Sequence, residues 1–272
     1  MLFTADRGSG PPVVLLHGQP GTHASWDPVV DLLEPSFRLL VPDRIGYGAT
    51  AGEARGVAEN ADLIADLIEE RGARPATVVA HSWSGGVAVL LADAHPELVG
   101  ALVLVGAACT PDSLDAVDRL LVVPGVGEVL TVAGLVGLGE VLPRVAGLVD
   151  RAPARYRDRL RTALPDHGVL GGAGGVLGRH RRTFLTEQRA LVEELPAVTA
   201  ALVRIRVPTA VVVGEWDLVV RPAAGRTLAR SVPGAELVRV QRAGHFVARD
   251  APELLAGVIA RYGRPTRERP VG

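Results

Sequence analysis

Three polar residues, far apart in the chain, have the types needed for nucleophilic catalysis. Ser82 lies in the segment Val78–Gly86 (VVAHSWSGG), where an apolar run meets a turn and then a helical pattern. Asp217 follows another apolar run, and His245 lies between a glycine and Phe246. A serine hydroxyl becomes a nucleophile when a histidine takes its proton, and a carboxylate orients that histidine. The three residues therefore predict a Ser-His-Asp triad, in the order Ser, Asp, His along the chain.

The residues around Ser82 indicate which serine is the nucleophile. A nucleophile on a sharp strand-to-helix turn needs small residues two positions before and two positions after it. Ala80 and Ser84 meet this need for Ser82, although the standard pattern has glycine at both places. A second frame makes Ser84 the nucleophile, with Ser82 and Gly86 as its small neighbours. We favour Ser82 because it directly follows the predicted strand; simple capping of the helix by these serines is the structural alternative.

Backbone N–H groups near the predicted nucleophile are candidates for an oxyanion hole. The segment His17–Gly21 (HGQPG) follows the first long apolar run. The N–H groups of Gln19 and of Trp83, the residue after the nucleophile, would stabilise the oxyanion. An ordinary turn is the alternative for such a segment. We interpret His17 as structural, because its side chain leaves a strand end and His245 is better placed as a base.

Other candidates concern the acid and the substrate pocket. Asp112 is the alternative acid, and Asp217 is preferred because it stands in a strand-Gly-x-x-Asp setting. Trp216 and Phe246 adjoin predicted catalytic residues and are candidates for the pocket, with core packing as the alternative. The apolar stretch Leu120–Leu142 indicates an apolar pocket roof, and hence an uncharged substrate with an apolar acyl or alcohol part.

Short apolar runs alternate with helical patterns along most of the chain, and these elements must position the candidate residues. Predicted strands cover residues 11–17, 37–43, 76–81, 98–107, 207–214 and 235–240, and predicted helices cover 53–71, 83–95, a segment from Pro222, and 252–262. This alternation predicts an α/β fold, with a mostly parallel sheet covered by helices on both faces. Each triad residue follows a predicted strand, and such sheets build their sites at that edge.

Residues 110–204 break the alternation. They are helical in character, rich in arginine near residues 150–161 and rich in glycine from 168 to 178. We expect residues 1–109 and 205–262 to form the core, 110–204 a helical cap inserted into it, and 263–272 a flexible tail. For the arginine run, a solvated helix face is favoured over an anion site.

Composition excludes several functions. A net charge of −1 argues against binding to nucleic acid. All 29 basic residues are arginine, so Schiff-base chemistry on lysine is excluded. Cys109 is the single cysteine, which rules out an intrachain disulfide, and we expect it to be buried rather than reactive. There is no apolar N-terminal run, and Pro124, Glu128 and Glu140 interrupt the longest apolar stretch. We expect a cytoplasmic protein with a small-molecule substrate and no membrane contact; the oligomeric state stays open.

Several of these segments resemble the motif set of the α/β-hydrolase superfamily, especially its lidded branch of small esterases, cofactor-free haloperoxidases, dehalogenases and epoxide hydrolases. They are His17–Gly21, Asp43–Gly48 (DRIGYG), His81–Gly86, Gly214–Asp217 and Gly244–Phe246. The resemblance covers residues 13–108 and 207–262. It implies the α/β-hydrolase fold, no cofactor or metal, and an acyl-enzyme mechanism carried by Ser82, His245 and Asp217. Dehalogenases and epoxide hydrolases need a carboxylate where this chain has Ser82, so neither activity is expected.

The chain departs from the family at its N-terminus. Only one strand fits before His17, where the family usually places a hairpin, so we expect the sheet to lack its first edge strand. The expected reaction is hydrolysis of a small, largely apolar carboxylic ester, thioester or lactone. A non-hydrolytic lyase or cyclase of a biosynthetic pathway, or a non-catalytic small-molecule binder, is the alternative on the same scaffold.

Overall fold

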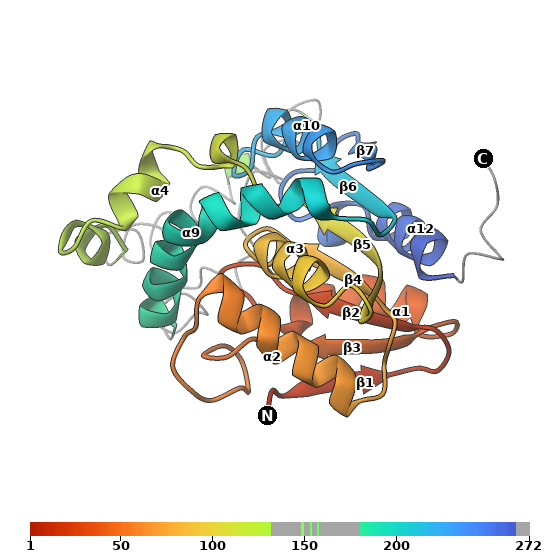
Figure 1. The fold of residues 1–272 in the computed structure, drawn as a ribbon. Helices are drawn as coiled ribbons and strands as arrows, with labels where there is room; N and C mark the ends of the chain where they lie inside the picture. The colour runs from red at the N-terminus through yellow and green to blue at the C-terminus, as the bar shows by residue number, and fades with distance from the viewer. Residues whose placement is uncertain (132–147, 150–152, 154–156, 158–179, 265–272) are drawn as a thin grey trace.

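A single seven-stranded sheet runs through the part of the protein that the computed structural model describes, which is residues 1–131, 148–149, 153, 157 and 180–264 (Figure 1). The strands are β1 (Thr4–Arg7), β2 (Pro12–Leu16), β3 (Arg38–Pro42), β4 (Ala76–His81), β5 (Val99–Val105), β6 (Thr209–Gly214) and β7 (Glu236–Val240). Their order across the sheet is β1-β3-β2-β4-β5-β6-β7. All six predicted strands are present, and the predicted mostly parallel sheet is confirmed.

The strand β1 is the exception to the parallel arrangement. It pairs antiparallel with β3, with Thr4 opposite Pro42 and Arg7 opposite Leu39, and it forms one edge of the sheet. One strand, not a hairpin, therefore precedes β2, as the short N-terminus predicts.

Alternate residues of the strands supply two separate cores, one on each face of the sheet. Val14 and Leu16 of β2 belong to one core, and Val13 and Leu15 belong to the other. The first face is covered by α2 (Val57–Glu70), α3 (Ser84–Ala94) and α10 (Pro222–Ser231), and the second by α1 (Asp27–Leu33) and α12 (Pro252–Gly263). Because both faces are covered, the central strands are apolar along their whole length. Among the described helices, none has the length and apolar character needed to cross a membrane.

Gly106 ends β5 earlier than its apolar pattern predicts. Its φ of +51° lies in the left-handed region that favours glycine, so the chain turns there and the strand stops at Val105. The N–H of Gly106 still donates to the carbonyl of Val212 in β6, at 2.9 Å. The turn after β5 is thereby held against β6 at the carboxyl edge of the sheet.

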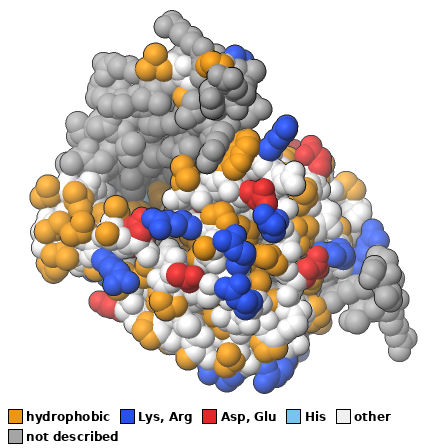
Figure 2. Space-filling view, turned by 90° about the horizontal axis from the view of Figure 1, so that it is seen from above, with side chains coloured by type: hydrophobic (Ala, Val, Ile, Leu, Met, Phe, Trp, Pro, Cys, Tyr) orange, Lys and Arg blue, Asp and Glu red, His pale blue; other side chains and the backbone are white. Residues whose placement is uncertain are grey.

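The described helices between β5 and β6 in the chain include two with both ends described. They are α4 (Ala116–Leu121), which follows the short 3-10 turn η2 (Pro111–Ser113), and the long α9 (Arg181–Ala201). Leu191 and Val198 of α9 join the core that α3 also contributes to. Three valines that follow α4 are exposed, namely Val123, Val126 and Val129. Figure 2 shows a group of apolar side chains at the left of its view. The glycine-rich part of the predicted cap, most of its arginine run, and the predicted tail from residue 265 onward lie outside the described residues.

Helix α9 also caps helix α2. The carboxylate of Glu194 accepts hydrogen bonds from the N–H groups of Val57 and Ala58, at 2.9 and 2.8 Å. A negative charge at a helix N-terminus satisfies free N–H groups and complements the helix dipole. The helix therefore begins at Val57, four residues later than predicted from the apolar spacing.

A buried ion pair joins α9 to the loop after β3. The guanidinium of Arg44 pairs with the carboxylate of Glu187, and both side chains are fully buried. Tyr47 donates its hydroxyl to the second oxygen of Glu187 at 2.9 Å. Arg44 also donates to the carbonyls of Gly18 and His17, at 3.0 and 3.3 Å. One arginine thus connects α9, the loop after β2 and the loop after β3.

Trp83 and Gln19 extend this connection. The guanidinium of Arg44 lies 4.4 Å from the centre of the Trp83 ring, and the indole N–H donates to the carbonyl of Glu187 at 2.9 Å. The side-chain amide of Gln19 donates to the carbonyl of Phe184 at 2.6 Å. The residues beside the predicted nucleophile and in the predicted oxyanion loop are therefore both held by α9.

We predict that Glu187→Gln destabilises the fold. The change leaves the buried charge of Arg44 without its partner. Removing one member of a buried ion pair lowers the free energy of unfolding by about 3–5 kcal/mol. Glu193→Gln is the matched control, because Glu193 is an exposed residue of the same helix, and it should change the free energy of unfolding by less than about 0.5 kcal/mol. Urea denaturation followed by circular dichroism measures both. Equal effects of the two changes would show that the ion pair does not hold α9.

Candidate active site

Ser82 occupies a strained turn between β4 and α3. Its φ is +55°, in the left-handed region that a residue with a side chain rarely adopts. Its N–H donates to the carbonyl of Val105 at 2.9 Å, and its carbonyl accepts from Gly85 at 2.9 Å and from Ala108 at 3.1 Å. Such strain, of order 1–3 kcal/mol, persists only where the surrounding structure enforces it. The turn presents the Ser82 side chain at the carboxyl edge of the sheet.

Ser84, the alternative nucleophile, has a different environment. It is the first residue of α3 and is fully buried. Its hydroxyl donates to the carbonyl of His17 at 2.6 Å. Ser84 thereby ties the nucleophile turn to the loop after β2, and its hydroxyl is already engaged.

Asp217 and His245 are joined directly. Nδ1 of His245 lies 2.9 Å from Oδ2 of Asp217, and both side chains are buried. The other oxygen, Oδ1, accepts from the N–H groups of Val219 and Val220 at 2.8 and 2.9 Å, which fixes the carboxylate. Because a carboxylate only accepts, Nδ1 carries the proton and Nε2 presents a lone pair. A Cβ on Gly106 would lie 3.2 Å from Nδ1 of His245 and 3.3 Å from Oδ2 of Asp217, so the turn after β5 passes close beneath the pair.

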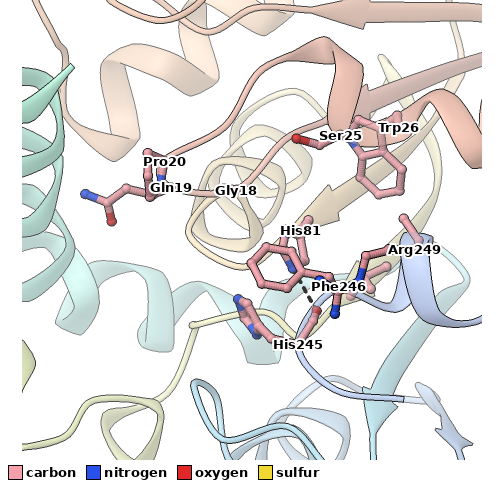
Figure 3. A pocket seen from close by; sticks show the side chains of 11 residues that line it. Gly18, Gln19, Pro20, Ser25, Trp26, His81, His245, Phe246 and Arg249 are labelled. Atoms are coloured by element: carbon pink, nitrogen blue, oxygen red, sulfur yellow. Dashed lines mark hydrogen bonds between the residues drawn. The ribbon is translucent and has the colours of Figure 1, made fainter. Parts of the chain in front are cut away.

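His81 links the nucleophile turn to the loop that carries His245. The His81 ring centre lies 4.6 Å from that of His245, and Nε2–H of His81 donates to the His245 carbonyl at 3.0 Å (Figure 3). Ser82 is the next residue in the chain. Within the described residues, neither the Ser82 hydroxyl nor Nε2 of His245 has a hydrogen-bond partner. The structure therefore brings all three triad candidates to one edge, with the donor and the acceptor of the predicted proton transfer both unengaged there.

Two histidines at this edge, the fully buried His17 and the half-buried His81, favour the neutral form. Burial holds the pKa of His17 well below its ordinary value, and burial together with the neighbouring His245 lowers the pKa of His81 to about 3. His17 donates from Nδ1 to the carbonyl of Gly18 at 2.9 Å and accepts at Nε2 from the N–H of Arg44 at 3.0 Å. Both nitrogens of His17 are thus used to hold backbone.

The loop after β2 passes close to the nucleophile. A Cβ on Gly18 would lie 2.7 Å from Nδ1 of His81 and 3.1 Å from Cβ of Ser82, so glycine is needed for this approach. Within the described residues, the N–H groups of Gln19 and Trp83 donate to no acceptor. The two predicted oxyanion donors therefore flank Ser82 with their N–H groups unengaged.

A cavity of about 150 Å³ adjoins Ser82. Its described lining consists of Gln19, Ser82 and Trp83 from the core, Asp118 and Gln188 as further polar side chains, and Ala108, Ser113, Leu114, Leu121, Phe184, Leu191, Val219 and Val220. The walls are thus mainly apolar. Burial raises the pKa of the Asp118 carboxyl above its ordinary value.

The predicted pocket residues Trp216 and Phe246 line two hollows other than the cavity beside Ser82. Trp216 lines a surface groove of about 620 Å³ that also contains three arginines. Phe246 lines a smaller hollow of about 70 Å³ that His245, His81 and Gln19 also line, with Trp26 and Arg249 on its other side (Figure 3). Its ring contacts those of His81 and His245, with centres 5.7 and 5.4 Å away. Neither residue lines the cavity beside Ser82.

Sequence reasoning missed the residues of α9 that line this cavity. The signal was a helical spacing that places three residues on one face of α9, namely Phe184, Gln188 and Leu191. Assigning a helix to this segment from the sequence would have revealed that face. Within the described part of the stretch Leu120–Leu142, Leu121 reaches the cavity, whereas Leu120 is 49% exposed.

The alternative acid, Asp112, is engaged away from His245. It accepts from the hydroxyls of Thr110 and Thr227 at 2.6 and 2.8 Å. Cys109 is fully buried, and burial raises the pKa of its thiol to about 12. In the ranges that the structure describes, no three His, Cys, Asp or Glu side chains converge in a way that could hold a metal ion.

The neutral histidines His17 and His81 predict a pH dependence of stability. Unfolding restores an ordinary pKa of about 6.5, so below that pH the unfolded chain binds protons that the folded chain does not. The free energy of unfolding should therefore fall as the pH is lowered from about 6.5 toward 3, by up to about 1.4 kcal/mol per pH unit for each histidine. His81→Gln, which can keep the hydrogen bond to the His245 carbonyl, should make this slope shallower.

Urea denaturation at several pH values measures the slope. His95→Gln is the control, because it removes an imidazole that is exposed on the surface. An unchanged slope in His81→Gln would contradict a neutral His81.

Comparison with known proteins identifies the family. Residues 13–258 match the sequence profile of the alpha/beta hydrolase family. The chain is 29% identical over 248 residues to the pimeloyl-[acyl-carrier protein] methyl ester esterase of Chromobacterium violaceum, covering 90% of this chain and 91% of the relative. It is 24% identical over 268 residues to haloalkane dehalogenase 2 of Mycobacterium tuberculosis, covering 95% and 90%.

A solved structure shows the same fold. A thermophilic esterase from Thermogutta terrifontis superimposes with a TM-score of 0.73 and 22% identity, over 96% of this chain and 92% of that one. Together with the profile match over most of the chain, these findings show that the protein belongs to the alpha/beta hydrolase family.

Proposed function

We propose that this member of the alpha/beta hydrolase family is a serine hydrolase that cleaves small carboxylic esters. The observation that carries the proposal is the strained backbone of Ser82 beside a histidine that a buried carboxylate holds in one tautomer. An ordinary helix start has no need of a left-handed serine, whereas a nucleophile on a sharp turn does. The relative named as a methyl ester esterase supports the same class of substrate.

In this proposal His245 acts as the general base. Its Nδ1–H is held by Asp217, so Nε2 takes the proton of Ser82 as the hydroxyl oxygen attacks the ester carbonyl. Asp217 then stabilises the positive imidazolium. The N–H groups of Gln19 and Trp83 stabilise the oxyanion of the tetrahedral intermediate. The imidazolium protonates the leaving alcohol, which leaves an acyl group on Ser82.

Water completes the reaction. His245 removes a proton from a water molecule, which attacks the acyl group and releases the carboxylic acid, and the proton returns to Ser82. The net reaction consumes one water per ester and yields an acid and an alcohol.

We further propose that residues 110–204 act as a cap over the catalytic residues. The described parts of this segment support the proposal, because Leu114, Leu121 and Phe184 line the cavity beside Ser82. Apolar walls suit an ester with an apolar acyl or alcohol part. Dehalogenation, the activity in the name of another relative, is not proposed, because Ser82 stands where that reaction needs a carboxylate.

We predict that Ser82→Ala lowers kcat/KM for p-nitrophenyl butyrate by at least about 10⁴-fold, because the nucleophile is lost. Ser84→Ala is the matched control. Its buried hydroxyl supports the loop after β2, so the change should reduce stability by about 1–3 kcal/mol and kcat/KM by less than about tenfold. Initial rates and urea denaturation measure both effects. Turnover that survives in Ser82→Ala but not in Ser84→Ala would reverse the assignment.

We also predict that Asp217→Asn lowers kcat by about 10³–10⁴-fold, because an amide no longer holds His245 in the required tautomer. Asp112→Asn tests the alternative acid and should lower kcat by less than about tenfold, since Asp112 contacts two threonines instead. The same initial-rate assay checks both variants. A larger loss in Asp112→Asn would contradict the assignment of Asp217.

Labelling with a serine-directed fluorophosphonate distinguishes a hydrolase from a lyase, a cyclase or a non-catalytic binder with the same fold. The proposal expects one adduct on Ser82 together with turnover of short p-nitrophenyl esters. Labelling without turnover would favour a lyase or cyclase, and no labelling would favour a non-catalytic binder.

A further inference from the structure

Among the polar side chains that line the cavity beside Ser82, two are hydrogen-bonded to each other. Asp118 belongs to α4 and Gln188 to α9, and the two meet across the cavity lining. The side-chain amide of Gln188 donates from Nε2 to Oδ1 of Asp118 at 2.9 Å. Gln188 is 3% exposed, and Asp118 is partly buried. Placing polar groups in such a setting is unfavourable unless their hydrogen-bonding capacity is used.

The capacity that this pair leaves unused is mostly for accepting hydrogen bonds, because only one N–H of the Gln188 amide remains as a donor. Because a carboxylate only accepts, the NH₂ group of Gln188 must face Asp118, and Oε1 of Gln188 faces elsewhere. No described residue donates to that oxygen. Among the described residues, the only side-chain nitrogen or oxygen that is both fully buried and without a hydrogen-bond partner is Nε1 of Trp26. Since Oε1 of Gln188 has no partner, it is not fully buried, and Gln188 is one of the residues that line the cavity.

Asp118 has spare capacity as well. Its Oδ1 accepts from Gln188, and its Oδ2 accepts from the N–H of Asp115 at 2.9 Å. A carboxylate offers about four acceptor positions, so about two are unused. The cavity thus combines mainly apolar walls, Ser82, and a negatively charged pair whose unused capacity is mostly for accepting hydrogen bonds.

We propose that Asp118 and Gln188 select esters whose acyl or alcohol chain ends in a hydrogen-bond donor, a hydroxyl or an ammonium group. This inference rests on the proposed function, and it refines the expectation of a wholly apolar substrate. The apolar part of the chain lies along the leucine and valine walls while the donor binds Oε1 of Gln188 and the carboxylate of Asp118. A chain ending in a carboxylate is disfavoured, because it would place two negative charges together. The covalent steps of ester hydrolysis are unchanged.

Four methyl esters of similar length test the proposal. They are methyl 6-hydroxyhexanoate, methyl 6-aminohexanoate, methyl heptanoate, which replaces the donor by a methyl group, and monomethyl adipate, which replaces it by a carboxylate. Acid release in a pH-stat gives kcat/KM for each ester. We expect the hydroxyl and ammonium esters to exceed methyl heptanoate by about tenfold, the effect of one or two hydrogen bonds. Monomethyl adipate should be the poorest of the four.

Two variants assign the preference to the named side chains. Gln188→Met keeps the length and removes the acceptor, so the preference for the hydroxyl ester should fall by about tenfold. Asp118→Asn removes the charge, so the ammonium ester should lose its advantage and monomethyl adipate should improve. Asp115→Ala is the control. It removes the N-terminal cap of α4, including the hydrogen bond from the N–H of Asp118 to Oδ1 of Asp115, and keeps every side chain that lines the cavity, so all four ratios should stay as in the unmodified protein.

Some results would overturn the proposal. They are equal or higher kcat/KM for methyl heptanoate, or the same change of ratios in Asp115→Ala as in Asp118→Asn, which would assign the pair a purely structural role. Calorimetric binding of the four esters to Ser82→Ala separates this failure from failure of the proposed function. If the protein hydrolyses none of the esters, a binding preference for donor ends still supports the selectivity, and its absence overturns it.

Discussion

The buried charge of Arg44 constrains the whole candidate site. A guanidinium without water is stable only when it is paired and hydrogen-bonded, and here Glu187 of α9 supplies the opposite charge. The same group donates to the carbonyls of His17 and Gly18 and stacks on Trp83. The loop proposed to hold the oxyanion, the residue after the proposed nucleophile and the cavity wall formed by α9 are thus fixed relative to one another. Burial raises the pKa of Glu187, and the charge of Arg44 opposes that shift.

The carboxyl edge of the sheet positions the three triad candidates. Parallel strands end together there, so β4, β6 and β7 bring Ser82, Asp217 and His245 to one place although they are far apart in the chain. Strain at Ser82 is supported by hydrogen bonds to the turn after β5. Gly18 and Gly106 allow two loops to approach this edge more closely than any side chain would permit. These two glycines therefore mark the places where the backbone comes close to the proposed catalytic residues.

Local pattern was enough to predict six of the seven strands, the parallel sheet and the candidate residues that meet at its edge, whereas the range of the edge strand β1 was not predicted. Those features depend on apolar runs and on motifs of a few residues. What the sequence did not reveal depends on contacts between distant residues. Glu194 sets the start of α2, and Gln188 reaches the cavity, only because α9 packs on the core. Trp216 and Phe246 were chosen because they adjoin predicted catalytic residues in the chain. They line hollows other than the cavity beside Ser82, and Phe246 shares its hollow with His245.

The most direct test of the central claim is to trap the acyl-enzyme. The protein is mixed with a p-nitrophenyl ester, quenched in acid within the first turnover, digested, and sequenced by fragment-ion mass spectrometry. The proposed mechanism predicts the mass of the acyl group on Ser82, and its loss when water is allowed time to react. An acyl group on Ser84 or on another residue, or turnover without any covalent adduct, would contradict it.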